Sequence, residues 1–345
     1  MKRVASRLRT PWRVGTLGLV LSVALAGCTT ATAQPTVRGY PSSSISVPLH
    51  VVACTTTDTC VALGTSGADA APSSVGEVRR ANGTWTALYV PPALSSLLSS
   101  AACWSSGCLI GGTQPTGDLL WNFDGPHHSV VATSAPRGGL GISDLSCFAP
   151  FACAAVDASG GSAGARLSFT SDGGTTWSVA RAMAWTSNDS PTALACSDAL
   201  NCLASASTPD GNAVLDVTHD GGATWSPLAS ASSWRSLSGL SCLGLDCVGL
   251  ASTPNGSALV RTKSFGQTWR VVPLAQITNA LACTRRARCA LVGQLSDHRA
   301  WLAVLHARKL KSVATRYVPT PLTSVACGAT VCAAINTSTV VSLRP

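Results

Sequence analysis

The sequence has few charged residues, two methionines and one glutamate. Only 11% of its 345 residues are charged, and its mean hydropathy is +0.28. Disordered chains have high charge and few apolar residues, so these values exclude disorder. Glycine and proline together supply 50 residues, too few for a collagen-like or low-complexity chain. The sequence therefore predicts a folded protein.

The only long apolar run lies in a basic leader. Residues 14–26 are apolar or small and follow five basic residues: Lys2, Arg3, Arg7, Arg9 and Arg13. The run is shorter than the roughly 20 residues of a membrane span and is typical of a secretory signal. Residues 25–28, Leu-Ala-Gly-Cys, resemble the bacterial lipobox, whose cysteine carries diacylglycerol after cleavage.

The lipobox resemblance implies a signal peptide over 1–27, a lipidated tether over 28–35 and a lipid on Cys28. It places the mature chain on the extracytoplasmic face of a bacterial cell envelope, in contact with the membrane through the lipid alone. The alternative is an ordinary signal peptide with a chance cysteine. Removing 1–27 leaves 19 basic and 15 acidic residues, a formal charge of +4. Nucleic-acid binders carry a stronger basic footprint, so we expect no nucleic-acid partner.

The other fourteen cysteines form a regular pattern. They fall into seven close pairs: Cys54/Cys60, Cys103/Cys108, Cys147/Cys153, Cys196/Cys202, Cys242/Cys247, Cys283/Cys289 and Cys327/Cys332. The first members of successive pairs lie 41 to 49 residues apart. A period of 40–50 residues built from short strands is typical of β-propellers. The sequence predicts an all-β fold over 36–345, a seven-bladed propeller of four-stranded antiparallel blades.

Each cysteine pair lies between two short apolar segments, as at the base of a β-hairpin. In an oxidising compartment, cysteines held this close form a disulfide, so we expect one disulfide in each blade. The alternative is metal binding. Zinc sites prefer two residues between cysteines and two converging pairs, whereas separate blades keep these pairs apart. We expect no metal and no cofactor.

A second motif follows several of the pairs. It is nearly intact at Thr170–Trp177 and Thr218–Trp225, lacks its aspartate at Thr262–Trp269, and keeps only its tail at Asn82–Trp85. It resembles the Asp-box, or BNR repeat, of a β-propeller family that includes sialidases, sortilin-type receptors and photosystem II stability-factor-like proteins.

The box residues predict a structural role. Asp-Gly-Gly favours a turn with positive φ, the aspartate can accept from turn amides, and the tryptophan buries a large surface. We assign this role to Asp172, Trp177, Asp220, Trp225, Trp269 and Trp85. The alternative is a calcium or carbohydrate site at Asp172 and Asp220.

The last blade has only three strands before Pro345, so we expect residues 36–40 to supply its fourth strand and close the ring.

We label the strands of a blade A to D, so that the D–A and B–C connections lie at the end opposite the cysteine hairpins and the boxes. Loops commonly carry recognition. Arginine pairs with carboxylates and aromatic rings stack on sugars, so we predict a ligand site at this mouth. Its residues are Arg137, Arg181, Trp185, Trp234, Arg235, Arg316 and Tyr317. The alternative is scattered solvated arginines and aromatic rings that fill gaps between blades.

The sequence offers little for catalysis. Sialidases use three arginines, a Tyr–Glu pair and an Asp, whereas Glu77 is the only glutamate here and falls on a C strand far from the mouth. Glycoside hydrolysis generally needs two facing carboxylates. We predict a monomeric, non-catalytic propeller that binds an envelope protein or a glycan. The alternatives are an atypical sialidase-like glycosidase and an assembly factor for envelope complexes.

Overall fold

The computed structural model describes residues 37–41, 48–65, 74–80, 83–91, 97–136, 139–158, 164–228, 233–284, 288–295, 299–306, 311–318, 321–336 and 339–343. For 37–41 and 311–318 the description covers the backbone alone. The chain divides into two units, Met1–Gln34 and Pro35–Pro345, and all described residues belong to the second. No described helix is long and apolar enough to cross a membrane.

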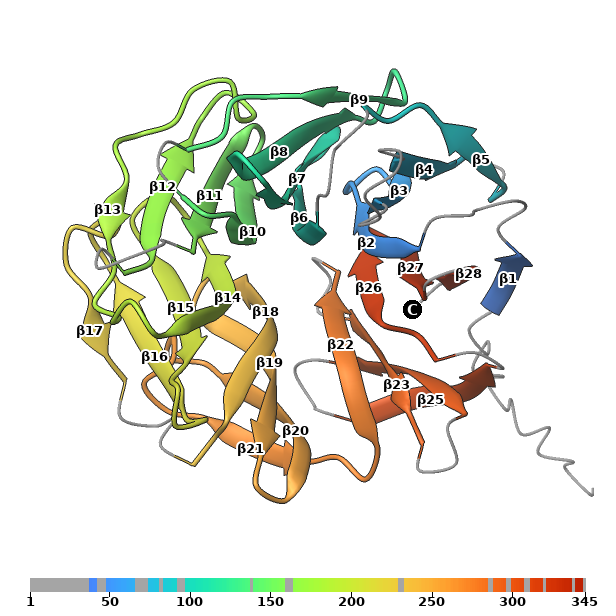
Figure 1. The fold of residues 1–345 in the computed structure, drawn as a ribbon. Helices are drawn as coiled ribbons and strands as arrows, with labels where there is room; N and C mark the ends of the chain where they lie inside the picture. Colours follow the sequence, from blue (N-terminus) through green and yellow to red (C-terminus); the bar gives the residue numbers. More distant parts are fainter. Residues whose placement is uncertain are drawn as a thin grey trace, which may run out of the picture. The chain divides into compact units, whose positions relative to one another are not determined.

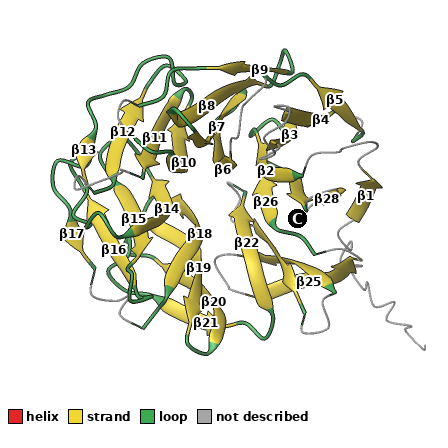
Figure 2. Ribbon diagram, viewed as in Figure 1, coloured by secondary structure: helices red, strands yellow, loops and turns green. Residues whose placement is uncertain are grey.

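The second unit consists of strands arranged in seven four-stranded antiparallel sheets, as predicted (Figures 1 and 2). The first three blades contain, from the axis outwards, β2 (Leu49–Cys54), β3 (Cys60–Thr65), β4 (Ser74–Arg79) and β5 (Trp85–Leu88); β6 (Leu97–Cys103), β7 (Gly107–Gln114), β8 (Gly117–Asp124) and β9 (Ser129–Ala132); and β10 (Ile142–Ala149), β11 (Ala152–Asp157), β12 (Arg166–Thr170) and β13 (Arg181–Ala182).

Blades 4 to 6 repeat the same order. They contain β14 (Ser190–Cys196), β15 (Cys202–Ser207), β16 (Ala213–Thr218) and β17 (Ser226–Pro227); β18 (Ser236–Leu243), β19 (Asp246–Thr253), β20 (Gly256–Thr262) and β21 (Arg270–Pro273); and β22 (Ile277–Cys283), β23 (Arg288–Gln294), β24 (Ala300–His306) and β25 (Lys311–Val318). Consecutive A strands contact one another around the axis, and β26 of the last blade contacts β2 of the first.

Blade 7 closes the ring with both ends of the unit. It contains β26 (Ser324–Cys327), β27 (Cys332–Ile335), β28 (Thr339–Leu343) and β1 (Val37–Pro41). Strand β1 pairs with β28 in antiparallel register, with Val37 opposite Leu343 and Pro41 opposite Thr339. The predicted closure by residues 36–40 is therefore confirmed to within a residue. This pairing covers an edge that β28 would otherwise expose.

The seven predicted cysteine pairs are confirmed as disulfides, one in the A–B hairpin of each blade. The bonds join Cys54 to Cys60, Cys103 to Cys108, Cys147 to Cys153, Cys196 to Cys202, Cys242 to Cys247, Cys283 to Cys289 and Cys327 to Cys332. In each pair the two residues are direct cross-strand partners. We call the end of the ring with the A–B hairpins and C–D turns the hairpin end. The opposite end, with the D–A and B–C connections, is the loop end.

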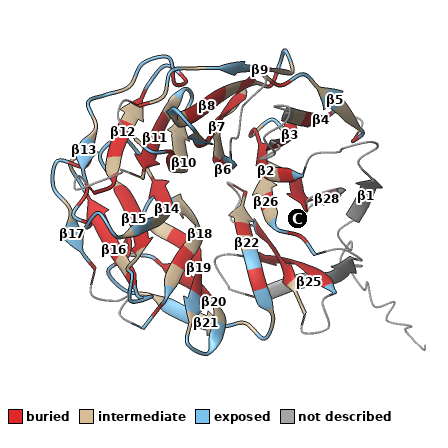
Figure 3. Ribbon diagram, viewed as in Figure 1, coloured by how far each residue is buried: buried red, intermediate tan, exposed pale blue. Residues whose placement is uncertain are grey.

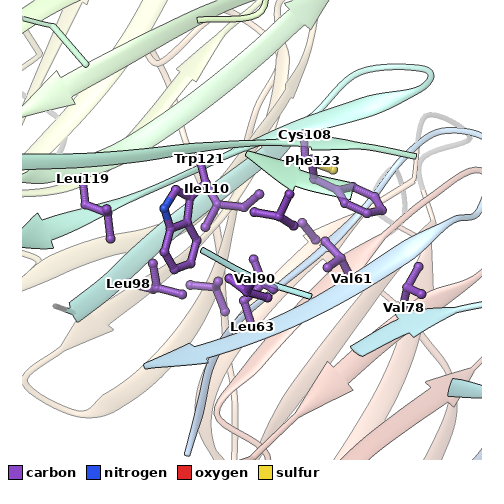
Figure 4. Packing of buried hydrophobic residues seen from close by; sticks show 13 residues of the cluster. Val61, Leu63, Val78, Val90, Leu98, Cys108, Ile110, Leu119, Trp121 and Phe123 are labelled. Carbon is purple, nitrogen blue, oxygen red and sulfur yellow. The ribbon is translucent and has the colours of Figure 1, made fainter. Parts of the chain in front are cut away.

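The hydrophobic core is divided among the spaces between blades. Alternate residues of one strand face opposite neighbours: Val61 and Leu63 of β3 pack toward blade 2, whereas Cys60 and Ala62 pack toward blade 7. Figure 4 shows the layer between blades 1 and 2, where Leu63 and Ile110 are among the packed residues. This alternation follows from the two-residue period of a strand. The outer strands β13 and β17 are exposed, and burial is greatest in the second strands of the blades, such as β11 and β15 (Figure 3).

Candidate binding site

An axial cavity of about 660 Å³ lies between the A strands of all seven blades. This volume is in the range of small-ligand pockets. Its walls extend from near the starts of the A strands, where Ser143 and Ser324 line it, to the A–B hairpins, where Thr56, Gly244 and Gly328 border it. Described residues of the D–A connections do not line it. The cavity therefore reaches the hairpin end, although the sequence analysis placed the ligand at the loop end.

An irregularity interrupts the A–B ladder in blades 1 to 6 at nearly the same level. The register shifts lie between Leu49/Val51, Leu98/Ser100, Ile142/Asp144, Pro191/Ala193, Ser238/Ser241 and Thr278/Ala280. A bulge redirects a side chain. The Asn279 side-chain amide donates to the Leu322 carbonyl of the next blade at 2.9 Å, and the Ser99 hydroxyl donates to the Ile142 carbonyl. These two bonds link blade 6 to blade 7 and blade 2 to blade 3.

Asp144 is the one carboxylate among the described residues that line the cavity. Its Oδ1 accepts from the Ser100 hydroxyl at 2.6 Å and the Leu145 amide at 2.9 Å, and its Oδ2 accepts from the Leu194 amide at 2.7 Å. The carboxyl group thus joins blades 2, 3 and 4. Burial raises the pKa of Asp144 above its usual value despite these donors. A charged residue in an otherwise small and apolar inner strand was the sequence signal that could have identified it.

The end of the cavity is bordered by the disulfides. The first cysteine of each pair lines it: Cys54, Cys103, Cys147, Cys196, Cys242, Cys283 and Cys327. Because each disulfide ties an A strand to its B strand, the hairpins at this end are covalently held in shape. A site on fixed hairpins has little conformational freedom to lose when a ligand binds.

The second cysteine of each pair has a different environment from the first. All seven of these residues are 0% exposed: Cys60, Cys108, Cys153, Cys202, Cys247, Cys289 and Cys332. They lie on the B strands, pack in the layers between blades and do not line the cavity. These cysteines therefore stabilise the hairpins from within the core, and only the first half of each disulfide borders the cavity.

The two intact box turns have the same hydrogen bonds. In blade 3, Asp172 accepts from the Thr176 hydroxyl at 2.6 Å, from the Thr176 amide at 2.9 Å and from the Thr170 hydroxyl at 2.8 Å. Gly174, at φ 90°, donates to the Thr170 hydroxyl at 2.9 Å. The Thr176 hydroxyl and amide, with other donors, lower the pKa of Asp172 to about 2. In blade 4, the Thr224 amide and hydroxyl likewise lower the pKa of Asp220 to about 2.

In blade 5 a serine takes the place of the box aspartate. The Thr268 amide donates to the Ser264 hydroxyl at 3.0 Å, and the Gly266 amide donates to the Thr262 hydroxyl at 2.9 Å. A neutral hydroxyl thus supplies the same acceptor, which explains how the turn keeps its form without the carboxylate. The box tryptophans Trp85, Trp177, Trp225 and Trp269 pack between blades.

Two of the predicted ligand residues are buried between blades. Trp185 is 7% exposed in the layer between blades 3 and 4, and Trp234 is 3% exposed between blades 4 and 5. The Trp234 ring lies edge-on to Trp269, with centroids 5.4 Å apart. Both rings therefore fill gaps between blades, which was the alternative interpretation, and neither lines the cavity.

The two predicted arginines whose side chains are described, Arg181 and Arg235, lie at opposite ends of the ring. The Arg181 guanidinium lies against the box turn of blade 4, where it donates to the Gly221 carbonyl at 2.7 Å and the Asp220 carbonyl at 3.1 Å. It is therefore at the hairpin end. Arg235 is exposed at the start of blade 5, on the loop end. Arg137, Cys28 and the side chains of Arg316 and Tyr317 lie outside the described residues. Ligand binding by these residues stays a prediction.

A carboxyl pair that sequence reasoning missed lies at the loop end, between blades 2 and 3. Asp118 and Asp157 both approach Gly139, where an added Cβ would come within 2.4 Å of an Asp118 oxygen and 2.8 Å of the Asp157 Cβ. The Arg166 Nε atom lies 3.8 Å from Asp157 Oδ2. Burial raises the pKa of Asp157 to about 6, opposed by Arg166 and assisted by the charge of Asp118. Glu77 is buried on the C strand β4 of blade 1, whereas the pair belongs to blades 2 and 3.

No protein-family model matches the chain, and no curated protein matches it. Solved structures do resemble it. YCF48 from Cyanidioschyzon merolae has a TM-score of 0.61 at 13% identity, over 90% of this chain and 99% of that one. YCF48 bound to D1 peptide has a TM-score of 0.60 at 13% identity, over 90% and 97%.

A sugar-bound structure is also similar. The Aleuria aurantia lectin in complex with Fucα1-6GlcNAc has a TM-score of 0.53 at 10% identity, over 82% of this chain and 98% of that one. Identities this low carry no residue role from one chain to another. What the likenesses show is the fold, and by its own strands and disulfides this chain is a seven-bladed β-propeller.

Proposed function

We propose that the chain is a non-catalytic binding propeller, anchored by a lipid on Cys28 at the extracytoplasmic face of a bacterial envelope. In this proposal a protein or glycan binds at the loop end of the ring. The observation that supports a non-catalytic role concerns the axial cavity. Asp144, the one carboxylate among its described lining residues, already accepts hydrogen bonds from three donors. Two similar propellers, one solved with a peptide and one with a sugar, support a binding role in general but not a particular ligand.

The arrangement of acids favours binding over hydrolysis. Retaining and inverting glycosidases need two carboxyl groups about 5 to 10 Å apart across the scissile bond. Asp144 has no carboxylate partner among the described lining residues. Asp118 and Asp157 are close together, but both pack at the interface of two blades, and Asp157 is only 1% exposed. Asp118 is half-buried, and a substrate would have to separate the blades to reach Asp157 as well.

The proposal is tested with the purified mature chain on a glycoside panel, a printed glycan array and a peptide array. We expect no turnover and retention of at least one array ligand. The exposed Arg235 is the described cation at the loop end that the prediction included, so Arg235→Ala should weaken retention at least threefold. Arg270→Ala, an exposed arginine on outer strand β21, is the matched control. Turnover of any glycoside that Asp144→Asn abolishes would contradict the proposal.

The anchor has a separate test. In cells, Cys28→Ser should prevent lipid attachment and move the protein from the membrane fraction to the soluble fraction. Mass spectrometry of the wild-type N-terminus should find a diacylglyceryl cysteine. An unmodified N-terminus at another residue would mean ordinary signal cleavage.

An assembly factor for envelope complexes is the second candidate. It is favoured by the likeness to YCF48, which extends over 90% of this chain. A co-purified envelope complex whose yield falls when the chain is deleted would select this candidate.

A further inference from the structure

Four large apolar side chains are exposed on the A–B hairpins of three consecutive blades. Phe151 in blade 3 is 50% exposed, Leu200 in blade 4 is 57% exposed, and Leu243 and Leu245 in blade 5 are 45% and 60% exposed. We call these four residues the apolar arc. Blades 3, 4 and 5 contact one another through β10, β14 and β18, so the arc follows adjoining hairpins (Figure 1).

Backbone hydrogen bonds hold the arc in place. The Phe151 carbonyl accepts from the Gly173 amide at 2.9 Å, the Leu200 carbonyl from the Gly221 amide at 2.9 Å, and the Leu245 carbonyl from the Phe265 amide at 3.0 Å. The box turn of each blade therefore fixes the hairpin tip beside it. Phe151 has φ 61°, a region that bulky residues rarely occupy. These exposed side chains sit on a braced backbone and not on a free loop.

The arc adjoins the hairpin end of the axial cavity. Leu243 and Gly244 of blade 5 line the cavity, and so does Ser197 of blade 4. The Ser197 hydroxyl donates to Asp198 at 3.1 Å, in the same turn as Leu200. The cavity wall at Ser197, the Asp198 carboxylate and the Leu200 side chain therefore belong to one turn at the rim of the cavity.

The rim is acidic beside blades 3 and 4. Burial alone would raise the pKa of Asp198, but donors from Asn201, Leu200 and Ser197 together lower it. Asp172 and Asp220, in the turns that brace Phe151 and Leu200, also have lowered pKa values, so all three are ionised at neutral pH. Two cations nearby are engaged: Arg181 with carbonyls, and Arg261 with Asp246. Lys263, beside the Leu245 turn, makes the blade 5 side less acidic.

We propose that the apolar arc and the adjoining cavity end form a docking site for a protein segment that carries apolar side chains together with lysine or arginine. The basic part of the segment lies against blades 3 and 4, and its apolar part lies against Leu243 and Leu245. A lipid surface fits less well, because bacterial membranes are anionic and the rim carboxylates repel them. A glycan fits less well, because three of the four arc side chains are leucines, which offer no flat face for stacking on a sugar. This site is independent of the ligand proposed at the loop end.

The test uses the full mature chain and fluorescently labelled synthetic peptides of 12 residues. Three series alternate Leu with Arg, Leu with Glu, and Ser with Arg. Fluorescence anisotropy should show binding of the Leu–Arg series at least tenfold tighter than of the other two, weakening as sodium chloride is raised. Vesicles of phosphatidylcholine with phosphatidylglycerol test the lipid alternative by flotation.

Variants locate the site. The double variant Leu243→Ser/Leu245→Ser should lose at least tenfold in affinity for the Leu–Arg peptides. Asp198→Asn, which keeps an oxygen acceptor for the turn amides, should lose threefold or more and reduce the salt dependence. Leu97→Ser, equally exposed at 59% but on the loop end, is the matched control and should bind as the parent does. A thermal melt of each variant checks that it is folded.

The outcomes separate this site from the loop-end proposal. Loss in the arc variants with normal binding by Leu97→Ser and Arg235→Ala supports the inference. Loss in Arg235→Ala or Leu97→Ser with none in the arc variants overturns it and leaves the loop-end ligand standing. Equal binding of all three series, binding of none, or flotation with vesicles that the arc variants abolish also overturns it.

Discussion

The two ends of the ring shift the pKa values of aspartates in opposite directions. At the hairpin end, Asp172 and Asp220 are held at the surface by hydroxyl and amide donors that lower the pKa of each to about 2. At the loop end, Asp157 is withdrawn between two blades, and burial raises its pKa to about 6. Donors that bind the charged form lower a carboxyl pKa, and loss of water raises it. Asp172 and Asp220 at the hairpin end therefore stay charged at physiological pH, whereas Asp157 at the loop end titrates near pH 6.

Disulfides add to this contrast. All seven lie at the hairpin end, where they also border the cavity. The loop end has none among the described residues, and its blades are joined by packing and by groups such as Asp144. A braced end with fixed charge suits recognition of a partner without rearrangement.

Reduction of the disulfides should give the largest effect. The loop-entropy model assigns roughly 2 kcal/mol to a short closed loop, and seven such terms together reach the upper part of the roughly 5–15 kcal/mol stability of a domain. A thermal scan in the presence of a strong reductant should therefore show loss of the cooperative transition. The double variant Cys283→Ser/Cys289→Ser, which removes one disulfide, is the graded control and should lower the melting temperature modestly. An unchanged transition after complete reduction would mean that packing alone holds the hairpin end.

Asp157→Asn should raise stability at neutral pH by about 1–2 kcal/mol and flatten its pH dependence. The folded-state pKa of about 6 lies above the ordinary value of 3.8, so the folded state binds more protons between these values. The parent's free energy of unfolding therefore falls as pH rises from about 4 to 6, and Asn removes that loss. Chemical denaturation at pH 4 to 7.5 measures it. Asp210→Asn, at an exposed turn residue, is the control, and parallel curves for Asp157→Asn and the parent would contradict the burial argument.

Asp220→Asn should give the smallest effect, of opposite sign. The folded-state pKa of about 2 lies below 3.8, so the parent gains stability from this group above pH 4 and loses it as pH falls toward 2. The variant should be slightly less stable at neutral pH and should lose less on acidification. Melting temperatures between pH 2 and 5 check the crossing of the two curves. Ser264 in blade 5 shows that a neutral acceptor can hold the same turn, so the variant should fold.

Several features of the fold and its turns were readable from local sequence. The spacing of the cysteine pairs predicted blades, disulfides and the closing strand β1, because each depends on residues close together in the chain or on a simple count of strands. The surface that binds a ligand was harder to predict from local sequence. Trp185 and Arg181 occupy predicted mouth segments, yet the ring of one is buried between blades and the guanidinium of the other reaches the neighbouring turn. The direction of a side chain leaving a blade depends on the twist and spacing of the neighbouring blade, which no local pattern contains.

The amino-acid sequence by itself determined the repeat, the disulfide pairing and the hydrogen-bonding residues of the box turns, since all of these act within one hairpin. Only the tertiary structure decided where the ring is hollow, which aspartates lose their water and which hairpin tips stay exposed. Those properties arise between blades: Asp144 meets Ser100 and Leu194 because three A strands converge on one axis. Convergence around an axis is a property of the closed ring as a whole, so it becomes visible only when the seven sheets are assembled.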